Sequence, residues 1–181
     1  MNATLQKDQT IDFYKAVIPI IISVFAVYLS IGIALGILPK FVQQHLGYNT
    51  VIVGLVIGLQ FLSTLLTRAY SGKTTDTKGA KSSKMRGVIF ATIAGISYVL
   101  SVALQGNPML ALSLLLLARV VHGIAESLLV TGALTWGIAL VGQSKSGKVM
   151  TWNGIAMYAG IAIGAPLSIW VSGSYGYFPA F

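Results

Sequence analysis

Three ionisable residues in one apolar stretch are the strongest candidates for chemistry in this sequence: Arg119, His122 and Glu126, in ARVVHGIAES. Their spacings of three, four and seven residues put all three on one face of a helix. A buried arginine stays charged only if a carboxylate or backbone carbonyls satisfy it, and Glu126 is a partner within reach. Histidine is the side chain that titrates near neutral pH. The stripe therefore indicates proton-responsive or anion-binding chemistry, with a structural ion pair between neighbouring helices as the alternative.

Three uncharged polar residues in other apolar runs extend this set: Tyr28, Gln60 and Tyr158. A lone amide such as Gln60 inside a membrane helix either faces a water-filled path or hydrogen-bonds a neighbouring helix, and both interpretations stay open. Together with the charged stripe, these residues predict one side of an apolar-lined substrate path through the membrane. Such a path suits a sugar, a drug or an organic anion.

Several kinds of site are excluded by residue type. The chain has no cysteine, no histidine pair with metal-ligand spacing and no Ser/His/Asp set. The segment 142–149, GQSKSGKV, nearly matches a phosphate-binding loop, but Val149 stands where a magnesium-binding hydroxyl is required and no strand precedes it. We therefore predict that the protein is not an enzyme and holds no metal and no cofactor.

Composition identifies the elements that must position these residues as membrane helices. The chain is 55% hydrophobic and 9% charged, with a mean hydropathy of +0.81, which leaves too little polar surface for a water-soluble globule. The net charge of +8 does not indicate nucleic-acid binding, because the basic residues sit at the ends of apolar runs, where anionic lipid explains them. We predict an all-α membrane protein, a helical transmembrane bundle in a lipid bilayer.

Apolar runs long enough to cross a bilayer divide the chain. We expect a tail at 1–16 and a transmembrane domain at 17–181, with spans at about 17–39, 51–67, 87–104, 109–134 and 150–171 and loops at 68–86 and 142–149. The fourth apolar stretch, 109–141, is longer than one crossing needs. It therefore either tilts and protrudes or breaks near Gly132 or Gly137.

The distribution of basic residues predicts the orientation. The segment 68–86, RAYSGKTTDTKGAKSSKMR, holds six of the twelve Lys and Arg residues. Short basic loops between membrane helices stay on the cytoplasmic side. Lys7, Lys15, Lys145 and Lys148 then fall on the same side, and Lys40 alone falls outside. We predict a multi-pass protein with a cytoplasmic N-terminus.

The basic segment also carries a specific spacing, Gly72-x-x-x-Asp76-x-x-Gly79-x-Lys81, with Lys78 inside it. This spacing resembles the signature loop between the second and third helices of the major facilitator superfamily. The chain departs from that pattern at Thr77, where the family usually has arginine. We interpret the five residues of the spacing as a conformational-switch loop.

The resemblance continues outside the loop. Arg119 with Gly123 resembles the Arg-x-x-x-Gly motif of the fourth helix in that superfamily, and VGLVIGLQFLSTLLTR is similar to bacterial members of the arabinose-efflux-like or drug-efflux-like kind. Gly160-x-x-x-Gly164-Ala165-Pro166 partly resembles the antiporter motif, here a helix-packing motif, with Ala165 in place of a glycine. Antiport is therefore less firmly indicated than transport.

The resemblance implies the N-terminal half of a secondary transporter that works by alternating access between two six-helix halves. It implies proton-coupled efflux of a small molecule, a sugar or a drug, across the bacterial cytoplasmic (inner) membrane. The partners implied are protons, the substrate, and either a C-terminal half beyond Phe181, beginning with a sixth span, or a second copy. In the family, the acidic residue matching Asp76 caps a helix of the other half.

A different class of function stays open beside transport. Gly32 and Gly36 form a small-xxx-small face of the kind that lets membrane helices approach closely. A non-transporting helical subunit that binds a partner through such faces is the alternative.

Overall fold

The fold is a bundle of membrane-length helices, described here from a computed structural model. The structure describes residues 2–180, and side chains from 13 to 179. The helices are α1 (Asn2–Lys40), which continues into the wider turn η1 (Phe41–His45), α2 (Thr50–Leu66), α3 (Arg68–Lys78), α4 (Ala80–Ala103), α5 (Pro108–Val141), η2 (Gln143–Lys145), α6 (Ser146–Tyr175) and η3 (Phe178–Ala180). No strand occurs among residues 2–180.

Local sequence explains where the helices begin and end. The Asn49 side chain caps α2 by accepting from Ile52 N at 3.1 Å. Asn107 caps α5 in the same way, through Leu110 N at 3.3 Å, and is followed by a proline, which suits a first helical position. Gly79 and Gly142 separate helices at φ of +86° and +85°, values that favour glycine.

Four segments of the described chain are each long and apolar enough to cross a membrane: Phe13–His45, Ala80–Ala103, Pro108–Val141 and Gln143–Tyr175. The fifth expected span, about 51–67, corresponds to α2, which has 17 residues. It passes the same test only together with α3, which is inclined to it by 44°. The prediction of an all-α transmembrane bundle is confirmed.

The basic segment 68–86, which we expected to connect two spans, is helical over most of its length. Residues 68–78 form α3, and 80–86 form the first two turns of α4. Nine of the segment's 19 residues are alanine, lysine, arginine or methionine, which are good helix formers, and Gly79 is the one interruption. Similarly, the expected loop 142–149 is irregular or 3₁₀-helical only at 142–145, because α6 begins at Ser146.

Helix α5 runs unbroken through Gly132 and Gly137, so of the two alternatives for this stretch the break does not occur. Its 34 residues span about 50 Å, at about 1.5 Å per residue. Helix α1 is also continuous from Asn2 to Lys40, without a boundary at residue 16. The helices thus extend past the apolar runs that the sequence delimits.

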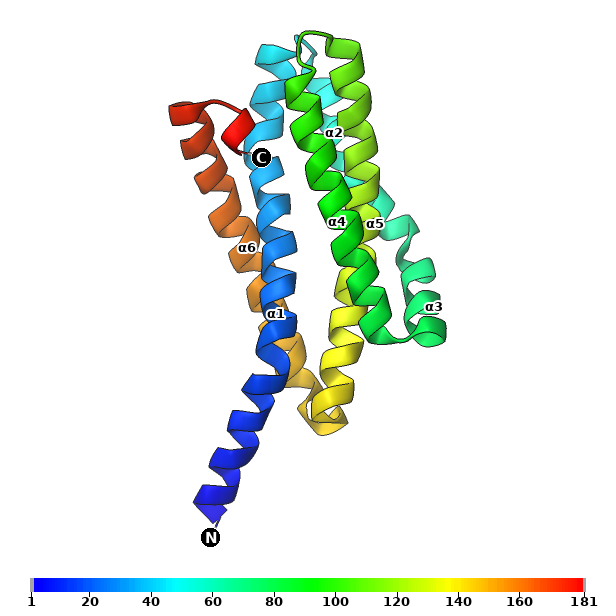
Figure 1. Ribbon diagram of the computed structural model, residues 1–181, viewed down its shortest axis with the longest axis vertical. Coiled ribbons are helices and arrows are strands. Elements are labelled where there is room, and N and C mark those ends of the chain that lie inside the picture. The colour runs from blue at the N-terminus through cyan, green and yellow to red at the C-terminus, as the bar shows by residue number, and fades with distance from the viewer. Residues whose placement is uncertain (1, 181) are drawn as a thin grey trace.

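The helices are arranged as two close pairs; α2 lies behind one of them, α4 and α5, and α3 lies at the side of that pair (Figure 1). Helix α1 lies beside α6, and α4 lies beside α5. A Cβ atom added at Gly32 of α1 would lie 2.8 Å from Ile161 O of α6. One added at Gly87 of α4 would lie 2.6 Å from Leu129 N of α5. Glycine at both places permits backbone contact between helices.

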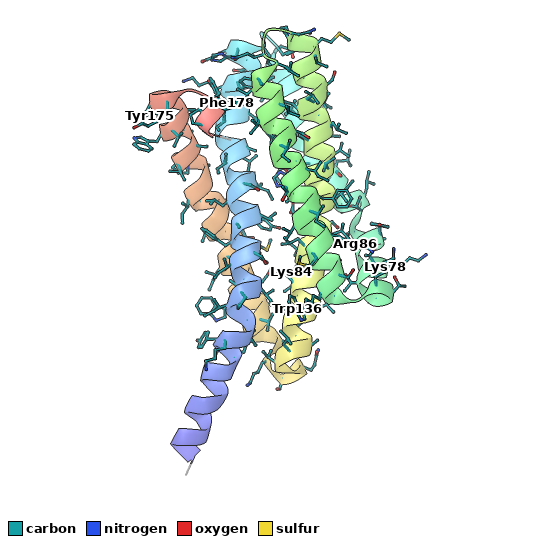
Figure 2. The ribbon with its side chains drawn as sticks, in the orientation of Figure 1. Lys78, Lys84, Arg86, Trp136, Tyr175 and Phe178 are labelled. Atoms are coloured by element: carbon teal, nitrogen blue, oxygen red, sulfur yellow. The ribbon has the colours of Figure 1, made fainter. Side chains whose placement is uncertain are left out.

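The two ends of the bundle differ in charge. Nine basic residues lie at the end that holds α3, the first turns of α4 and the α5–α6 connection, hereafter the basic end: Lys15, Arg68, Lys73, Lys78, Lys81, Lys84, Arg86, Lys145 and Lys148. Figure 2 shows Lys78, Lys84, Arg86 and Trp136 at this end, with Tyr175 and Phe178 near the other. The opposite end has Lys40 at the end of α1.

Candidate functional site

Buried and half-buried polar side chains from four helices meet inside the bundle and form the candidate site. We name this group the polar cluster: Tyr28 and Ser30 of α1, Gln60 and Thr64 of α2, Tyr98 of α4, and Arg119, His122 and Glu126 of α5. Its centre is the predicted stripe on α5, which lies between the two helix pairs.

Arg119 is fully buried, with 0% of its surface exposed, and is held by α2 and α4. Its Nε donates to Val56 O at 3.0 Å and its Nη2 to Ile57 O at 3.2 Å. Its Nη1 donates to the Tyr98 hydroxyl at 3.3 Å. Carbonyl oxygens have a second lone pair beyond the one used inside the helix, so α2 can satisfy this guanidinium without breaking its own backbone bonds.

The ion pair expected between Arg119 and Glu126 is absent from the described side chains. Two helical turns separate the residues, about 10 Å along the axis. Each side chain instead reaches sideways to a different part of the neighbouring helices. The guanidinium of Arg119 is therefore satisfied by backbone carbonyls and not by a carboxylate.

Glu126 is 7% exposed and accepts hydrogen bonds from uncharged donors. The Tyr28 hydroxyl donates to Oε1 at 2.9 Å. Gln60 Nε2 donates to Oε2 at 3.1 Å, and the Thr64 hydroxyl lies 3.0 Å from the same oxygen. In the part of the chain with described side chains, no Lys or Arg pairs with this carboxylate. Glu126 is therefore a buried acid without a counter-charge in contact.

His122 links α5 to α4 and α1. Its Nδ1 lies 3.1 Å from the Tyr98 hydroxyl and its Nε2 lies 3.2 Å from the Ser30 hydroxyl. A guanidinium only donates, so the Tyr98 oxygen accepts from Arg119 and its own proton is directed to Nδ1. Ser30 donates onward to Val27 O at 2.7 Å. This order assigns the remaining imidazole proton to Nε2.

Close contact between α2 and α5 brings Gln60 into the cluster. A Cβ atom at Gly123 would collide with Gln60 O and would lie 2.7 Å from Ser63 Cβ. The Ser63 hydroxyl donates to Val120 O at 2.8 Å across the same contact. Gln60 is fully buried, and its Oε1 has no hydrogen-bond partner. One acceptor next to Glu126 is thus unsatisfied, a costly state for a buried amide.

The structure brings five of the six predicted pathway residues together and leaves one apart. Tyr28, Gln60, Arg119, His122 and Glu126 belong to the cluster, whereas Tyr158 on α6 is 75% exposed. Sequence reasoning missed Ser30, Thr64 and Tyr98. Hydroxyl side chains are common in membrane helices, so nothing local distinguishes these three from others.

The residues of the predicted switch loop lie at the surface of the basic end. Gly72, Asp76 and Lys78 belong to α3, Gly79 joins α3 to α4, and Lys81 is in the first turn of α4. Asp76 is exposed. Helix α3 is attached to α5 elsewhere, through a 2.8 Å hydrogen bond between the Ser71 and Ser127 hydroxyls.

The predicted packing motif on α6 faces α1 through its glycines. A Cβ at Gly160 would lie 2.8 Å from Leu29 N, and one at Gly164 would collide with Leu29 O. Pro166 lies inside α6 and is exposed. The two glycines therefore lie at the α1–α6 contact, and the proline lies outside it.

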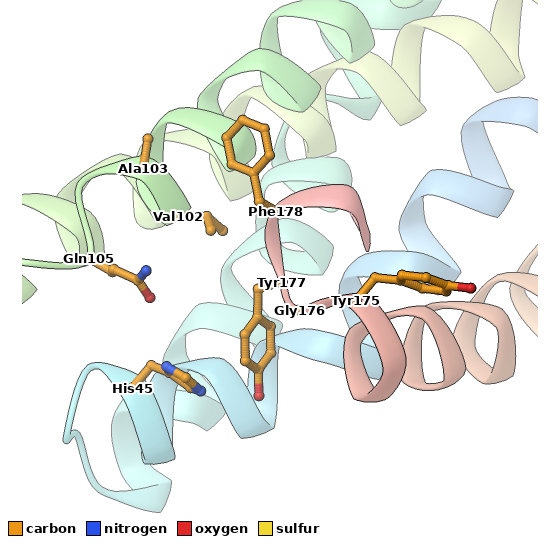
Figure 3. Close-up of a pocket in the computed structure, with 8 residues that line it drawn as sticks. All are labelled: His45, Val102, Ala103, Gln105, Tyr175, Gly176, Tyr177 and Phe178. Carbon is orange, nitrogen blue, oxygen red and sulfur yellow. The ribbon is translucent and has the colours of Figure 1, made fainter.

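A cavity of about 350 Å³ opens at the end opposite the basic end (Figure 3). Its walls include His45 at the end of η1 and Tyr177 near the end of the chain, with ring centroids 4.5 Å apart. Burial raises the pKa of the Tyr177 phenol above its usual value. None of the polar-cluster side chains lines this cavity.

Comparison with known proteins identifies similar sequences. A family model described as Major Facilitator Superfamily matches residues 13–181. An uncharacterized MFS-type transporter of Pseudomonas aeruginosa is 46% identical over 147 residues, 81% of this chain and 37% of that protein. One from Salmonella typhimurium is 38% identical over 169 residues, 93% of this chain and 42% of that protein. The chain thus spans about two fifths of the length of these relatives. No solved structure matches the chain.

Proposed function

Because the chain belongs to the major facilitator superfamily, with the fold of a transporter's N-terminal half, we propose that the protein is a secondary active transporter. It would move a small molecule, a sugar or a drug, out of the bacterial cell across the cytoplasmic membrane by alternating access. The flow of protons down their gradient across the membrane would supply the energy. The second half of the substrate path would come from a C-terminal half or a second copy.

The observation that carries this proposal is the environment of Glu126. A buried carboxylate with only neutral donors has no fixed positive charge in contact to hold it ionised. Ionisable groups at membrane depth cost at least about 2.5 kcal/mol. A protein that keeps one there without an ion pair gains a group that can alternate between a proton-loaded and an ionised state.

The other members of the cluster have supporting roles in this proposal. Arg119 ties α2 to α5 through backbone carbonyls, which leaves Glu126 without an ion partner. His122, between the Tyr98 and Ser30 hydroxyls, provides a hydrogen-bonded route toward α1 and α4. We assign Tyr158, exposed on α6, to the face that meets the substrate or the second half.

The basic end would supply the conformational switch. We assign Asp76 the role of a latch that caps a helix of the second half, because a carboxylate is stabilised at a helix N-terminus. Its exposure leaves it available for such a contact. In this arrangement the basic end faces the cytoplasm, and so does the N-terminus.

A non-transporting subunit is the second candidate, and the open face of α2 is the surface that it would use. Gly54 and Gly58 have no atom within 4 Å of an added Cβ, and Leu55 and Leu62 of the same helix are exposed. A partner helix fits this face, but the second half of a transporter fits it equally. A buried acid without an ion pair is explained more directly by proton-coupled transport than by partner binding, so transport remains our conclusion.

The test is proton flux in reconstituted full-length protein. Proteoliposomes loaded with a pH-sensitive dye are given a panel of monosaccharides and lipophilic cations. We expect compound-dependent proton flux with the wild type and none with Glu126→Gln. Gln60 now faces residue 126 with its Nε2, and a flip of its amide lets the unsatisfied Oε1 accept from the new amide, so this variant should lose little thermal stability. Wild-type flux with lowered stability would instead make Glu126 a structural residue.

A further inference from the structure

Two lysines share one tryptophan at the basic end of the bundle. The Nζ of Lys84 lies 5.1 Å from the centroid of the Trp136 ring, and the Nζ of Lys81 lies 5.7 Å from it. The lysines come from the first two turns of α4 and the indole from the last two turns of α5. We name these three residues the lysine–indole site; Figure 2 labels Lys84 and Trp136.

Lys84 is buried without an anionic partner. It is 7% exposed, and its contact among the described residues is the indole ring. Its Nζ is not among the fully enclosed polar atoms of the described chain, and its three donors have no protein acceptor, so the ammonium can bind an anion from outside. Its backbone is packed against α5, since a Cβ at Gly132 would lie 2.5 Å from Lys84 N. The side chain therefore starts inside the α4–α5 contact.

The helix terminus at the site adds to this excess of positive charge. Helix α4 has no acidic residue in its first turn, and Gly79 provides no capping side chain. The first backbone N–H groups of a helix and its macrodipole favour anions, whereas lysines there are unfavourable. Two lysines at this position are explained if a negatively charged ligand binds between them and the helix start.

The surface next to the site indicates a lipid. Lys81 begins a row of exposed residues along one face of α4, with spacings of three and four: Met85, Ile89, Ile93, Ile96 and Leu100. This row extends about 28 Å at about 1.5 Å per residue, close to the hydrocarbon thickness of a bilayer. A free anion makes no contact with this apolar face, whereas the acyl chain of a lipid can pack along it.

We propose that Lys81, Lys84 and Trp136 bind the phosphate of an anionic phospholipid whose acyl chain lies along the exposed face of α4. The indole occupies the interfacial depth that tryptophan prefers, and the lysines extend from the α4–α5 contact to the headgroup. This site is separate from the polar cluster and does not depend on what the protein transports.

Binding is tested on purified full-length protein in detergent, by native mass spectrometry and by fluorescence of Trp136 in a Trp152→Phe/Trp170→Phe background. The probes are short-chain phosphatidylglycerol, phosphatidylcholine and inorganic phosphate. We expect saturable binding of phosphatidylglycerol alone. A lysine near a membrane surface contributes about fivefold to the affinity for anionic lipid, so Lys84→Met should weaken it about fivefold and Lys81→Met/Lys84→Met about 25-fold. Lys84→Arg should retain it.

A matched control separates this site from the general charge of the basic end. Lys73→Met/Lys145→Met removes the same charge from an exposed and a half-buried position outside the lysine–indole site and should change the affinity less than twofold. Equal losses in both double variants would overturn the proposal. Equal binding of phosphatidylcholine, or of inorganic phosphate, would overturn the anionic lipid as the ligand. Mass spectrometry needs no tryptophan substitution, so it decides the outcome if the fluorescence background folds poorly.

Discussion

The Tyr28 hydroxyl of α1 donates a 2.9 Å hydrogen bond to Glu126 Oε1 of α5, across 98 residues of sequence. It connects the α1–α6 pair to the α4–α5 pair at the buried acid. The same hydrogen bond therefore belongs both to the proposed proton site and to the contact between the two helix pairs.

Replacement of Tyr28 by phenylalanine should lower the free energy of unfolding by about 1–2 kcal/mol. Hydrogen bonds in membrane proteins average about 0.6 kcal/mol, but this acceptor is a carboxylate, which forms stronger bonds. The measurement is thermal unfolding in detergent. Tyr175→Phe, at an exposed position, is the control and should have no effect. Equal unfolding temperatures for Tyr28→Phe and the wild type would mean that the bond contributes little.

Arg119→Lys should lower stability by about 1–3 kcal/mol although the charge is kept. The guanidinium reaches two carbonyls of α2 and the Tyr98 hydroxyl at once, and a single ammonium on a flexible stem cannot reproduce that fork. Arg68→Lys, at an exposed position, should stay within about 0.5 kcal/mol. Full stability of Arg119→Lys would show that charge alone suffices here.

Gly164→Ala should disturb the α1–α6 contact. The added methyl would collide with Leu29 O, a backbone atom that cannot rotate away, and overpacking of this kind costs about 1–3 kcal/mol. Gly154→Ala on the same helix is the control, because its Cβ meets no atom within 4 Å. Thermal unfolding compares the two, and a control that loses as much as Gly164→Ala would argue against a specific contact.

Gly79→Ala should destabilise the junction between α3 and α4, whereas Gly72→Ala should not. Gly79 has φ +86° and ψ 149°, a conformation open almost only to glycine, at a cost of about 1–3 kcal/mol for other residues. Gly72 is helical and has open space around it. Hydrogen exchange of α3 is the measurement. Faster exchange in Gly79→Ala alone is the expected outcome.

Asp76→Asn should reduce transport by the full-length protein while stability stays nearly constant. Asp76 is exposed, and exposed charges contribute about 0–1 kcal/mol to stability. A latch that biases the inward-open and outward-open states by about 1–3 kcal/mol changes their populations roughly five- to 150-fold. Cysteine accessibility from each side, measured with flux, tests the latch. If accessibility and flux both stay at wild-type values, the basic segment 68–86 only determines the membrane topology.

The fold was largely predictable, because membrane helices are identified by length and hydropathy without knowledge of their neighbours. The site was predictable in part. Arg119, His122 and Glu126 attract attention as charges in apolar sequence, but spacing gives their positions along α5 and not their lateral neighbours. The pairing of Arg119 with Glu126 was therefore wrong. Tyr98 and Thr64 were missed because a hydroxyl gains its role only from the rotation of its helix.

Helix α1 packs against α6, and more than 100 residues separate the two helices in the chain. A ribosome adds roughly 5–20 residues per second, so α1 waits roughly 5–20 s after its own synthesis before its partner exists. During that interval the faces of Gly32 and Gly36 lie against lipid or the insertion machinery. Pairing of α1 with α6 is therefore a late step in biogenesis, because it cannot begin before α6 has been made.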